Sequence, residues 1–237
     1  MVLSVGNLCI DSRALAAPMA GITDAPFRRM VRRFGAAPCY TEMAGSRELV
    51  AGDRKAAGRA ELDPGELSGA ALTGVQIAGR EPGPVAEAAR RAEGAGARLI
   101  DLNMGCPAKK VTGGLSGSAL MRDEDLAARM VEAAAAAVSV PVTVKMRLGW
   151  DALTAPSLAR HAVAAGARAL TVHGRTRTQF YTGTADWTAV RAVVEAVEVP
   201  VIVNGDVTDA ATARAALAAS GAAAVMIGRA MRGAPWR

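Results

Sequence analysis

The feature that most constrains the fold is a regular alternation of short apolar runs with segments of helical spacing. Eight apolar runs recur, at residues 15–17, 39–41, 75–78, 99–102, 142–146, 169–172, 201–203 and 224–227. Helical spacing marks residues 25–34, 84–95, 124–138, 155–165, 187–196 and 209–218. Strands that alternate with helices indicate a parallel sheet. Because each run is apolar nearly throughout and there are eight of them, we predict a closed (β/α)8 TIM barrel.

Residues at the helix boundaries agree with this prediction. Asp24 is followed by Pro26, and Asp186 and Asp209 precede later helices, as capping side chains do. Gly166 and Gly221 stand where helices commonly stop. Residues 2–13 indicate a small strand pair that caps the bottom of the barrel.

One domain is predicted over residues 1–237, because the chain contains no low-complexity linker. Its composition is 51% hydrophobic but only 3% aromatic, so aliphatic residues and alanine must build the core. The chain ends at Arg237, a few residues after the eighth run. We therefore expect the barrel to lack its eighth helix.

Charge and cysteine content limit the class of protein. The formal net charge of +6 permits an acidic partner such as nucleic acid or phosphate, although a bias toward Arg, Ala and Gly explains it equally well. Three cysteines without metal-ligand spacing argue against a zinc site or a disulfide framework, so we expect no bound metal and a reducing cytoplasm. The N-terminus lacks an export signal, and charged residues and a proline interrupt the most apolar window, at residues 127–144. We expect no membrane association.

A thiol follows the fourth apolar run, in the stretch from Asp101 to Pro107. Asp101 and Asn103 share one face of the predicted strand, because side chains alternate along a strand. Glycine and proline flank Cys106 and end the strand, and two lysines follow. This context indicates a catalytic Cys106, whereas the other two cysteines are typical of packing.

Polar groups mark the ends of most of the runs, where the chemistry of such barrels lies. A solvated rim explains one or two of them, but not Gln76, Lys145 and His173 within apolar runs. Loops after the last two strands carry Asn204-Gly205-Asp206 and Gly228-Arg229, the usual phosphate site of these barrels. The pattern predicts a phosphorylated ligand, with Lys145 in the barrel mouth stabilising negative charge on a bound ring.

Two weaker features receive other interpretations. The glycine-rich segment 113–117 does not join a strand directly to a helix, so we predict a mobile lid rather than a phosphate loop. His161 lies within a predicted helix, and we expect an ordinary surface residue.

With these residues located, the sequence resembles the tRNA-dihydrouridine synthases, nearest to their bacterial B-type branch, over residues 8–237. The resemblance rests on motifs in a fixed order, namely APMAGITD at 17–24, DLNMGCP at 101–107, VKMR at 144–147, VHGRTR at 172–177, DW at 186–187 and NGD at 204–206.

The resemblance implies an FMN barrel that reduces uridine in tRNA with electrons from NADPH or NADH. By matching motif, the implied FMN contacts are Pro18, Met19, Ala20, Gln76, Lys145, His173, Asn204, Gly205, Asp206, Gly228 and Arg229. Asn103 would hold the uracil and Cys106 would be the general acid. The hydride would pass from flavin N5 to uracil C6, and the Cys106 proton to C5. A thiol suits this role because it is ordinarily protonated near neutrality.

Substrate phosphates are assigned by charge and position to Arg147, Arg175 and Arg177, with Lys109 and Lys110. We expect a monomer. The family continues into a C-terminal helical domain that grips tRNA, which these 237 residues do not contain. We therefore expect weakened tRNA affinity and an exposed apolar seam.

Two alternatives stay open. One is an FMN barrel that acts on a small free substrate, similar to a dihydroorotate dehydrogenase or an ene-reductase. The other is a truncated flavin-binding fragment without turnover. The DLNMGCP and VHGRTR motifs favour the tRNA enzyme over the first of these.

Overall fold

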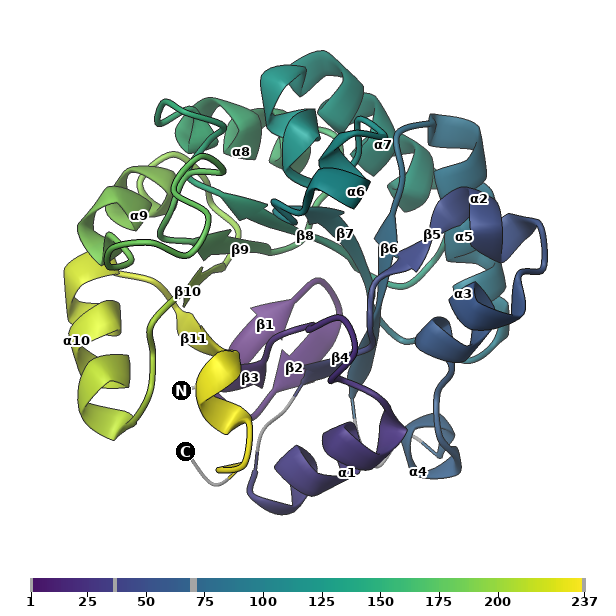
Figure 1. Cartoon of the computed structure of the whole chain (residues 1–237), viewed down its shortest axis with the longest axis horizontal. Helices are drawn as coiled ribbons and strands as arrows, with labels where there is room; N and C mark the ends of the chain where they lie inside the picture. The colour runs from purple at the N-terminus through teal and green to yellow at the C-terminus, as the bar shows by residue number, and fades with distance from the viewer. Residues whose placement is uncertain (1, 36–37, 69–71, 236–237) are drawn as a thin grey trace.

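The computed structural model describes residues 2–35, 38–68 and 72–235, and it contains the predicted barrel (Figure 1). The eight barrel strands are β3 (Ala14–Ala16), β4 (Cys39–Tyr40), β6 (Thr73–Ala78), β7 (Ile100–Met104), β8 (Val142–Arg147), β9 (Leu170–His173), β10 (Val201–Asn204) and β11 (Ala224–Ile227). They run in the order β3-β11-β10-β9-β8-β7-β6-β4. Between the two end strands, the amide of Ala16 donates to the Pro38 carbonyl at 3.1 Å. The sheet is therefore nearly closed, and the predicted α/β TIM-barrel fold is confirmed.

Six longer helices surround the sheet (Figure 1). They are α1 (Ala25–Arg33), α5 (Pro82–Gly94), α7 (Glu124–Ala137), α8 (Ala155–Ala164), α9 (Trp187–Val194) and α10 (Ala210–Ser220). The predicted caps are confirmed: Asp24, Asp186 and Asp209 each accept a backbone N–H of the first helical turn. Gly221 ends α10 with a φ of 70°, a left-handed conformation that glycine adopts without strain.

Short elements that the sequence pattern did not reveal fill the connections. They are β5 (Ala44–Gly45), α2 (Ser46–Val50), α3 (Arg54–Ala60), α4 (Pro64–Leu67), α6 (Lys109–Thr112) and the 3-10 helices η1 (Gly117–Arg122) and η2 (Arg229–Met231). Helices of so few residues complete at most two turns, too little for a helical period to be recognised. Within the described part of the chain, η2 is the last regular element after β11.

A buried ion-pair cluster ties α4 to α1. Arg28 contacts Glu66 at 2.7 Å, and Arg32 bonds both Glu66 and Asp63. Burial would raise the pKa of Glu66, but hydrogen bonds from Arg28, the Asp63 amide and Arg32 lower it to about 2. The cluster fixes the long connection between β4 and β6 against the barrel.

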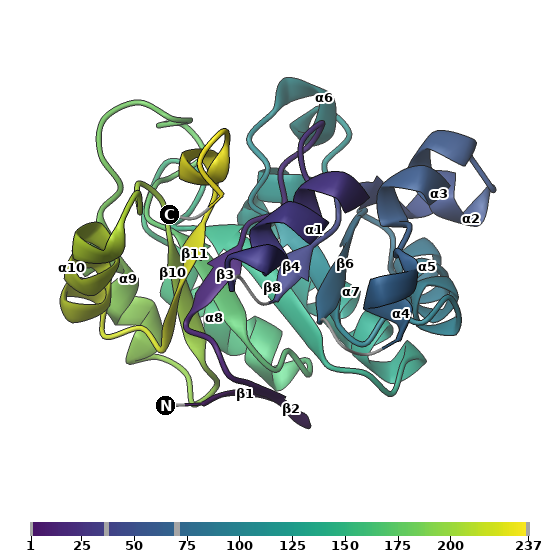
Figure 2. The same ribbon diagram turned by 90° about the horizontal axis from the view of Figure 1, so that it is seen from below.

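The bottom of the barrel is apolar, and the predicted strand pair lies beneath it. β1 (Leu3–Val5) and β2 (Leu8–Ile10) pair antiparallel there (Figure 2). Their buried side chains pack in one cluster with barrel residues that include Leu15, Tyr40 and Ile202. A Cβ at Gly74 would approach the Tyr40 ring to 2.7 Å, so glycine makes room for this ring. Among the described helices, none is long and apolar enough to span a membrane.

Candidate active site

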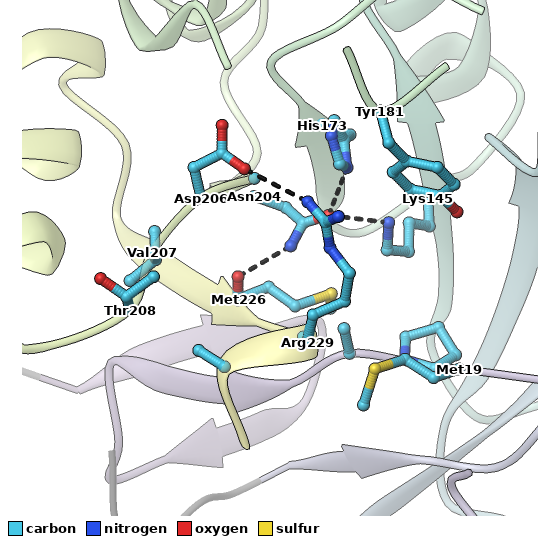
Figure 3. Close-up of a pocket in the computed structure, with 15 residues that line it drawn as sticks. Met19, Lys145, His173, Tyr181, Asn204, Asp206, Val207, Thr208, Met226 and Arg229 are labelled. Atoms are coloured by element: carbon cyan, nitrogen blue, oxygen red, sulfur yellow. Dashed lines mark hydrogen bonds and ion pairs between the residues drawn. The ribbon is translucent and has the colours of Figure 1, made fainter. Parts of the chain in front are cut away.

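A cavity of about 380 Å³ opens at the other end of the barrel, where the strands end (Figure 3). Its walls combine apolar side chains with a few converging polar groups, as small-molecule sites commonly do. It is lined by Ala17, Pro18, Met19, Lys145, His173, Tyr181, Asn204, Gly205, Asp206, Val207, Thr208, Met226, Gly228, Arg229 and Ala230.

Asn204 organises the polar wall of this cavity (Figure 3). Its amide donates to the Met226 carbonyl at 2.8 Å, which fixes the orientation of the side chain. Its Oδ1 then accepts from Lys145 Nζ and meets His173 Nδ1, each at 3.0 Å. Because an ammonium carries three N–H groups and only one is used here, Lys145 has donors left for a ligand.

His173 is held neutral, with its proton on Nδ1. Its Nε2 lies 3.2 Å from a guanidinium nitrogen of Arg175, which can only donate. Nε2 must therefore accept, and Nδ1 must carry the hydrogen that Asn204 receives. Burial, with the charges of Lys145, Arg147 and Arg175, lowers the pKa of His173 well below its usual range. This histidine consequently serves as a positioned neutral ring and not as a proton shuttle near neutrality.

The loop after β10 places a carboxylate between two guanidinium groups. Asp206 contacts Arg175 at 2.6 Å and Arg229 at 3.4 Å. Burial alone would raise the pKa of Asp206, but the bonds from Arg175 and the Ala185 amide keep it lowered. Gly205 precedes it with a φ of 112°, and a Cβ there would approach Ala185 to 2.8 Å. Glycine is required at this turn for both reasons.

Lys145 is a half-buried cation in the wall of the cavity. Burial, together with the charge of Arg147, lowers the pKa of Lys145 to about 8, although Asp101 opposes the shift. The ammonium is therefore mostly protonated at neutral pH and poorly solvated. A partly desolvated cation gains more from an anionic ligand than a solvated one does.

Cys106 follows the end of β7 and is not among the lining residues, but it lies close enough to the lining residue Lys145 to interact with it electrostatically. The Cys106 side chain is partly exposed, while Cys9 is exposed and Cys39 is buried. Ser118 donates to the Cys106 carbonyl through its amide at 3.1 Å and its hydroxyl at 2.9 Å. Ser118 directly follows the predicted lid segment, residues 113–117. The end of that segment is therefore bonded to the loop that carries Cys106, which we call the thiol loop (Gly105–Pro107).

Most of the residues predicted to bind the cofactor come together in the cavity. Those that line it are Pro18, Met19, Lys145, His173, Asn204, Gly205, Asp206, Gly228 and Arg229. Ala20 and Gln76 do not line it, and Gln76 is 1% exposed within β6. Asn103 is also buried, and its amide bonds Gln76.

Two of the three arginines assigned to phosphates, Arg147 and Arg175, are buried. Arg147 is buried and donates to the carbonyls of Gly105, Thr176 and Phe180, at 2.8 to 2.9 Å. Arg175 is buried too and is occupied by His173, Asp206 and loop carbonyls. Both arginines therefore fasten loops, because they donate to loop carbonyls within the protein.

Arg177 lies with its guanidinium carbon 4.6 Å from the centre of the Trp150 ring. Lys109 and Lys110, by contrast, begin the exposed turn α6. His161 is exposed on α8 and contacts Glu124 at 2.9 Å, as an ordinary surface residue can.

Several lining residues were not anticipated, among them Tyr181, Val207, Thr208 and Met226. Tyr181 comes from the long loop after β9, and its ring lies beside the guanidinium groups of Arg147 and Arg229, at 5.4 and 5.0 Å. Hydrophobic periodicity does not mark loop residues, so the position of Tyr181 at the cavity could not be predicted from the sequence. Met226 carried a signal, since it alternates with residues that face the helices on β11.

Known proteins resemble the chain closely. The family model described as dihydrouridine synthase matches residues 15–237. A probable tRNA-dihydrouridine synthase of Rhodobacter capsulatus is 56% identical over 239 residues, covering 100% of this chain and 73% of that protein. A tRNA-dihydrouridine synthase B of Xanthomonas campestris is 48% identical, covering 99% of this chain and 70% of the relative.

Solved structures also share the fold. Morphinone reductase in complex with tetrahydroNAD superposes with a TM-score of 0.69 at 14% identity, over 98% of this chain and 86% of that one. Nitroalkane oxidase from Streptomyces ansochromogenes gives a TM-score of 0.52 at 20% identity, over 92% and 65%. At these identities the likeness concerns the barrel architecture alone.

Proposed function

The chain belongs to the dihydrouridine synthase family, and we propose that it is a flavin-dependent enzyme that reduces uridine in tRNA to 5,6-dihydrouridine. The reductant is NADPH or NADH. The observation that carries this proposal is a cavity lined by the poorly solvated Lys145 and by Arg229, with the thiol of Cys106 near that lysine. Residues 1–237 form its flavin-binding catalytic domain, which acts as a cytoplasmic monomer.

The residues of the cavity fit FMN in charge and polarity. Met19 and Met226 offer apolar surface to a flat ring, and the unused donors of Lys145 suit an electron-rich ring edge. Arg229 and the backbone after β10 and β11 suit a phosphate, the usual anion at this end of such barrels. When bound, the flavin supplies the hydride for C6 of the uracil.

The side chains of the protein perform the remaining tasks. Cys106 donates the proton to C5 as the general acid. Lys145 stabilises negative charge at the ring edge. Asn204, which neutral His173 also contacts, holds that lysine in place. The target base must leave its stack to reach a site at the end of a barrel. Lys109 and Lys110, which are exposed on α6, meet the neighbouring phosphates.

The test offers three oxidised substrates to the purified chain together with NADPH: a uridine-bearing tRNA transcript, orotate and a simple cyclic enone. We expect bound yellow flavin and dihydrouridine in the transcript. Turnover of a free small molecule alone would favour the small-substrate alternative. A protein that stays colourless with added FMN would contradict both readings.

Cys106→Ala provides the matched variant. It should keep flavin binding and NADPH oxidation while dihydrouridine formation falls about 100-fold or more, because general acid catalysis contributes factors of this order. Cys9→Ala is the control, since Cys9 is exposed at the opposite end of the barrel. An unchanged dihydrouridine yield in Cys106→Ala would remove Cys106 from its role.

A further inference from the structure

A chain of hydrogen bonds runs inside the barrel from a buried carboxylate to the thiol loop. Asp101 accepts from the Gln76 amide at 2.7 Å, and Gln76 Oε1 accepts from the Asn103 amide at 2.9 Å. Asn103 Oδ1 in turn accepts from the backbone N–H groups of Gly105 and Cys106, at 3.2 and 2.9 Å. The three side chains are 1% to 9% exposed. None of these three side chains lines the cavity.

The groups at the two ends of this hydrogen-bond chain fix the direction in which its bonds are donated. The backbone N–H groups of Gly105 and Cys106 can only donate, and an ionised carboxylate can only accept. The two side-chain amides between them must therefore point the same way, oxygen toward the thiol loop and nitrogen toward Asp101. If the Gln76 amide turned over, Asn103 would have to follow, and its nitrogen would then face two donors. Aligned bonds of this kind also polarise and strengthen one another.

Asp101 is buried without a direct ion pair. Among the described residues, no lysine or arginine nitrogen lies within ion-pair distance of it. Its second oxygen accepts from the Thr143 hydroxyl at 2.7 Å. A buried carboxylate is expensive unless hydrogen bonds compensate it, so its retention here calls for a role.

We propose that Asp101 is a positioning residue: it sets the direction of the Gln76 and Asn103 amides and thereby holds the Cys106 backbone, and with it the thiol, in one place. The inference rests on the proposed function only in making this thiol the proton donor. Placement matters for such a donor, because an error of about 1 Å can cost about 100-fold in rate.

The role depends on an acceptor at this position rather than on charge. In Asp101→Asn, the new oxygen can still accept from Gln76 while the new amide donates to Thr143. The Thr143 hydroxyl then turns to the Ile100 carbonyl, which lies 3.3 Å away. Asp101→Leu keeps the branched shape and offers no acceptor at all. The two variants therefore separate the acceptor from the charge.

The experiment measures two properties of the thiol loop in a Cys9→Ala background, under conditions where each variant is folded. One is the rate at which iodoacetamide alkylates Cys106; the other is hydrogen exchange at the amides of Gly105 and Cys106. We expect Asp101→Leu to speed both by about tenfold, the scale of one lost buried hydrogen bond. Asp101→Asn should stay within about threefold of the parent.

Thr143→Val is the matched control, because it removes the other hydrogen bond of Asp101 and leaves the chain to Cys106 intact. It should leave alkylation and exchange at the parent rates. If Asp101→Leu does not fold, Gln76→Met cuts the next link with little change of shape and should produce the same increases.

Three outcomes would overturn the proposal. Alkylation and exchange at the parent rates in Asp101→Leu would show that the hydrogen-bond chain does not hold the thiol loop. Where Asp101→Leu does not fold, parent rates in Gln76→Met would show the same. Equal effects in Asp101→Asn and Asp101→Leu would assign the effect to charge. A matching increase in Thr143→Val would assign it to general stability. Because both readouts need no substrate, a chain that makes no dihydrouridine would contradict the proposed function and still leave this inference testable.

Discussion

Lys145 allows a sharp test, because its function and its contribution to folding oppose each other. The ammonium is held at the barrel mouth by Asn204 at 3.0 Å, with Arg147 two residues further along the same strand. Burial and that neighbouring charge lower its pKa to about 8, from 10.5. A lysine kept protonated at this position destabilises the ligand-free protein.

The sign and size follow from proton linkage. A depressed lysine pKa means that the unfolded chain binds the proton more tightly, so stability is lowest below pH 8 and recovers as the pH rises toward 10.5. The penalty is about 3 kcal/mol at pH 7, about 2 kcal/mol at pH 9 and about 1 kcal/mol at pH 10. Lys145→Met removes this penalty and loses one hydrogen bond, worth about 1 kcal/mol.

We therefore expect the ligand-free Lys145→Met variant to be more stable than the parent by about 2 kcal/mol at pH 7. The difference should vanish near pH 10. Urea unfolding of both proteins at pH 6 to 10 measures it, since titrating groups that do not interact with Lys145 cancel in the difference. FMN affinity, by contrast, should fall in the variant. A methionine variant that is less stable at pH 7, with a difference that does not change with pH, would refute the desolvation argument.

Two further perturbations probe the frame around the site. Glu66→Gln breaks the buried pair with Arg28 and should destabilise the protein by about 3 kcal/mol at pH 7. Because the folded-state pKa is lowered to about 2, the parent should lose this advantage as the pH falls from about 5 to 2; acid unfolding curves that stay parallel would contradict the assignment. Gly205→Ala places a Cβ 3.2 Å from His173 Nε2 at a φ of 112°, so thermal unfolding should show a loss of about 2 to 4 kcal/mol. A neutral result there would mean that the loop after β10 relaxes freely.

Much of the fold could be read from periodicity. All eight barrel strands lie within two residues of the predicted runs, because a strand buried on both faces has to be apolar nearly throughout. The caps at Asp24, Asp186 and Asp209 followed from local hydrogen-bond chemistry. The elements between β4 and β6 escaped prediction, since tertiary ion pairs such as Arg28–Glu66 hold them in place.

The candidate site divides in the same way. Residues at strand ends, such as Lys145, His173 and Asn204, could be placed together in advance, because the carboxyl ends of parallel strands meet at one end of a barrel. What their donors and acceptors contact could not be foreseen. Arg147 was predicted to bind a substrate phosphate, but in the structure it donates to three loop carbonyls.

The sequence by itself therefore determined the barrel, the end at which its polar groups gather and the family, because these depend on residue type and order. Only the tertiary structure decided how those groups are used. It directed Gln76 toward Asp101 and Asn103, and it brought Tyr181 to the cavity from a distant loop. Hydrogen bonds are short and directional, so their pairing depends on positions within a fraction of an ångström, which no pattern along the chain specifies.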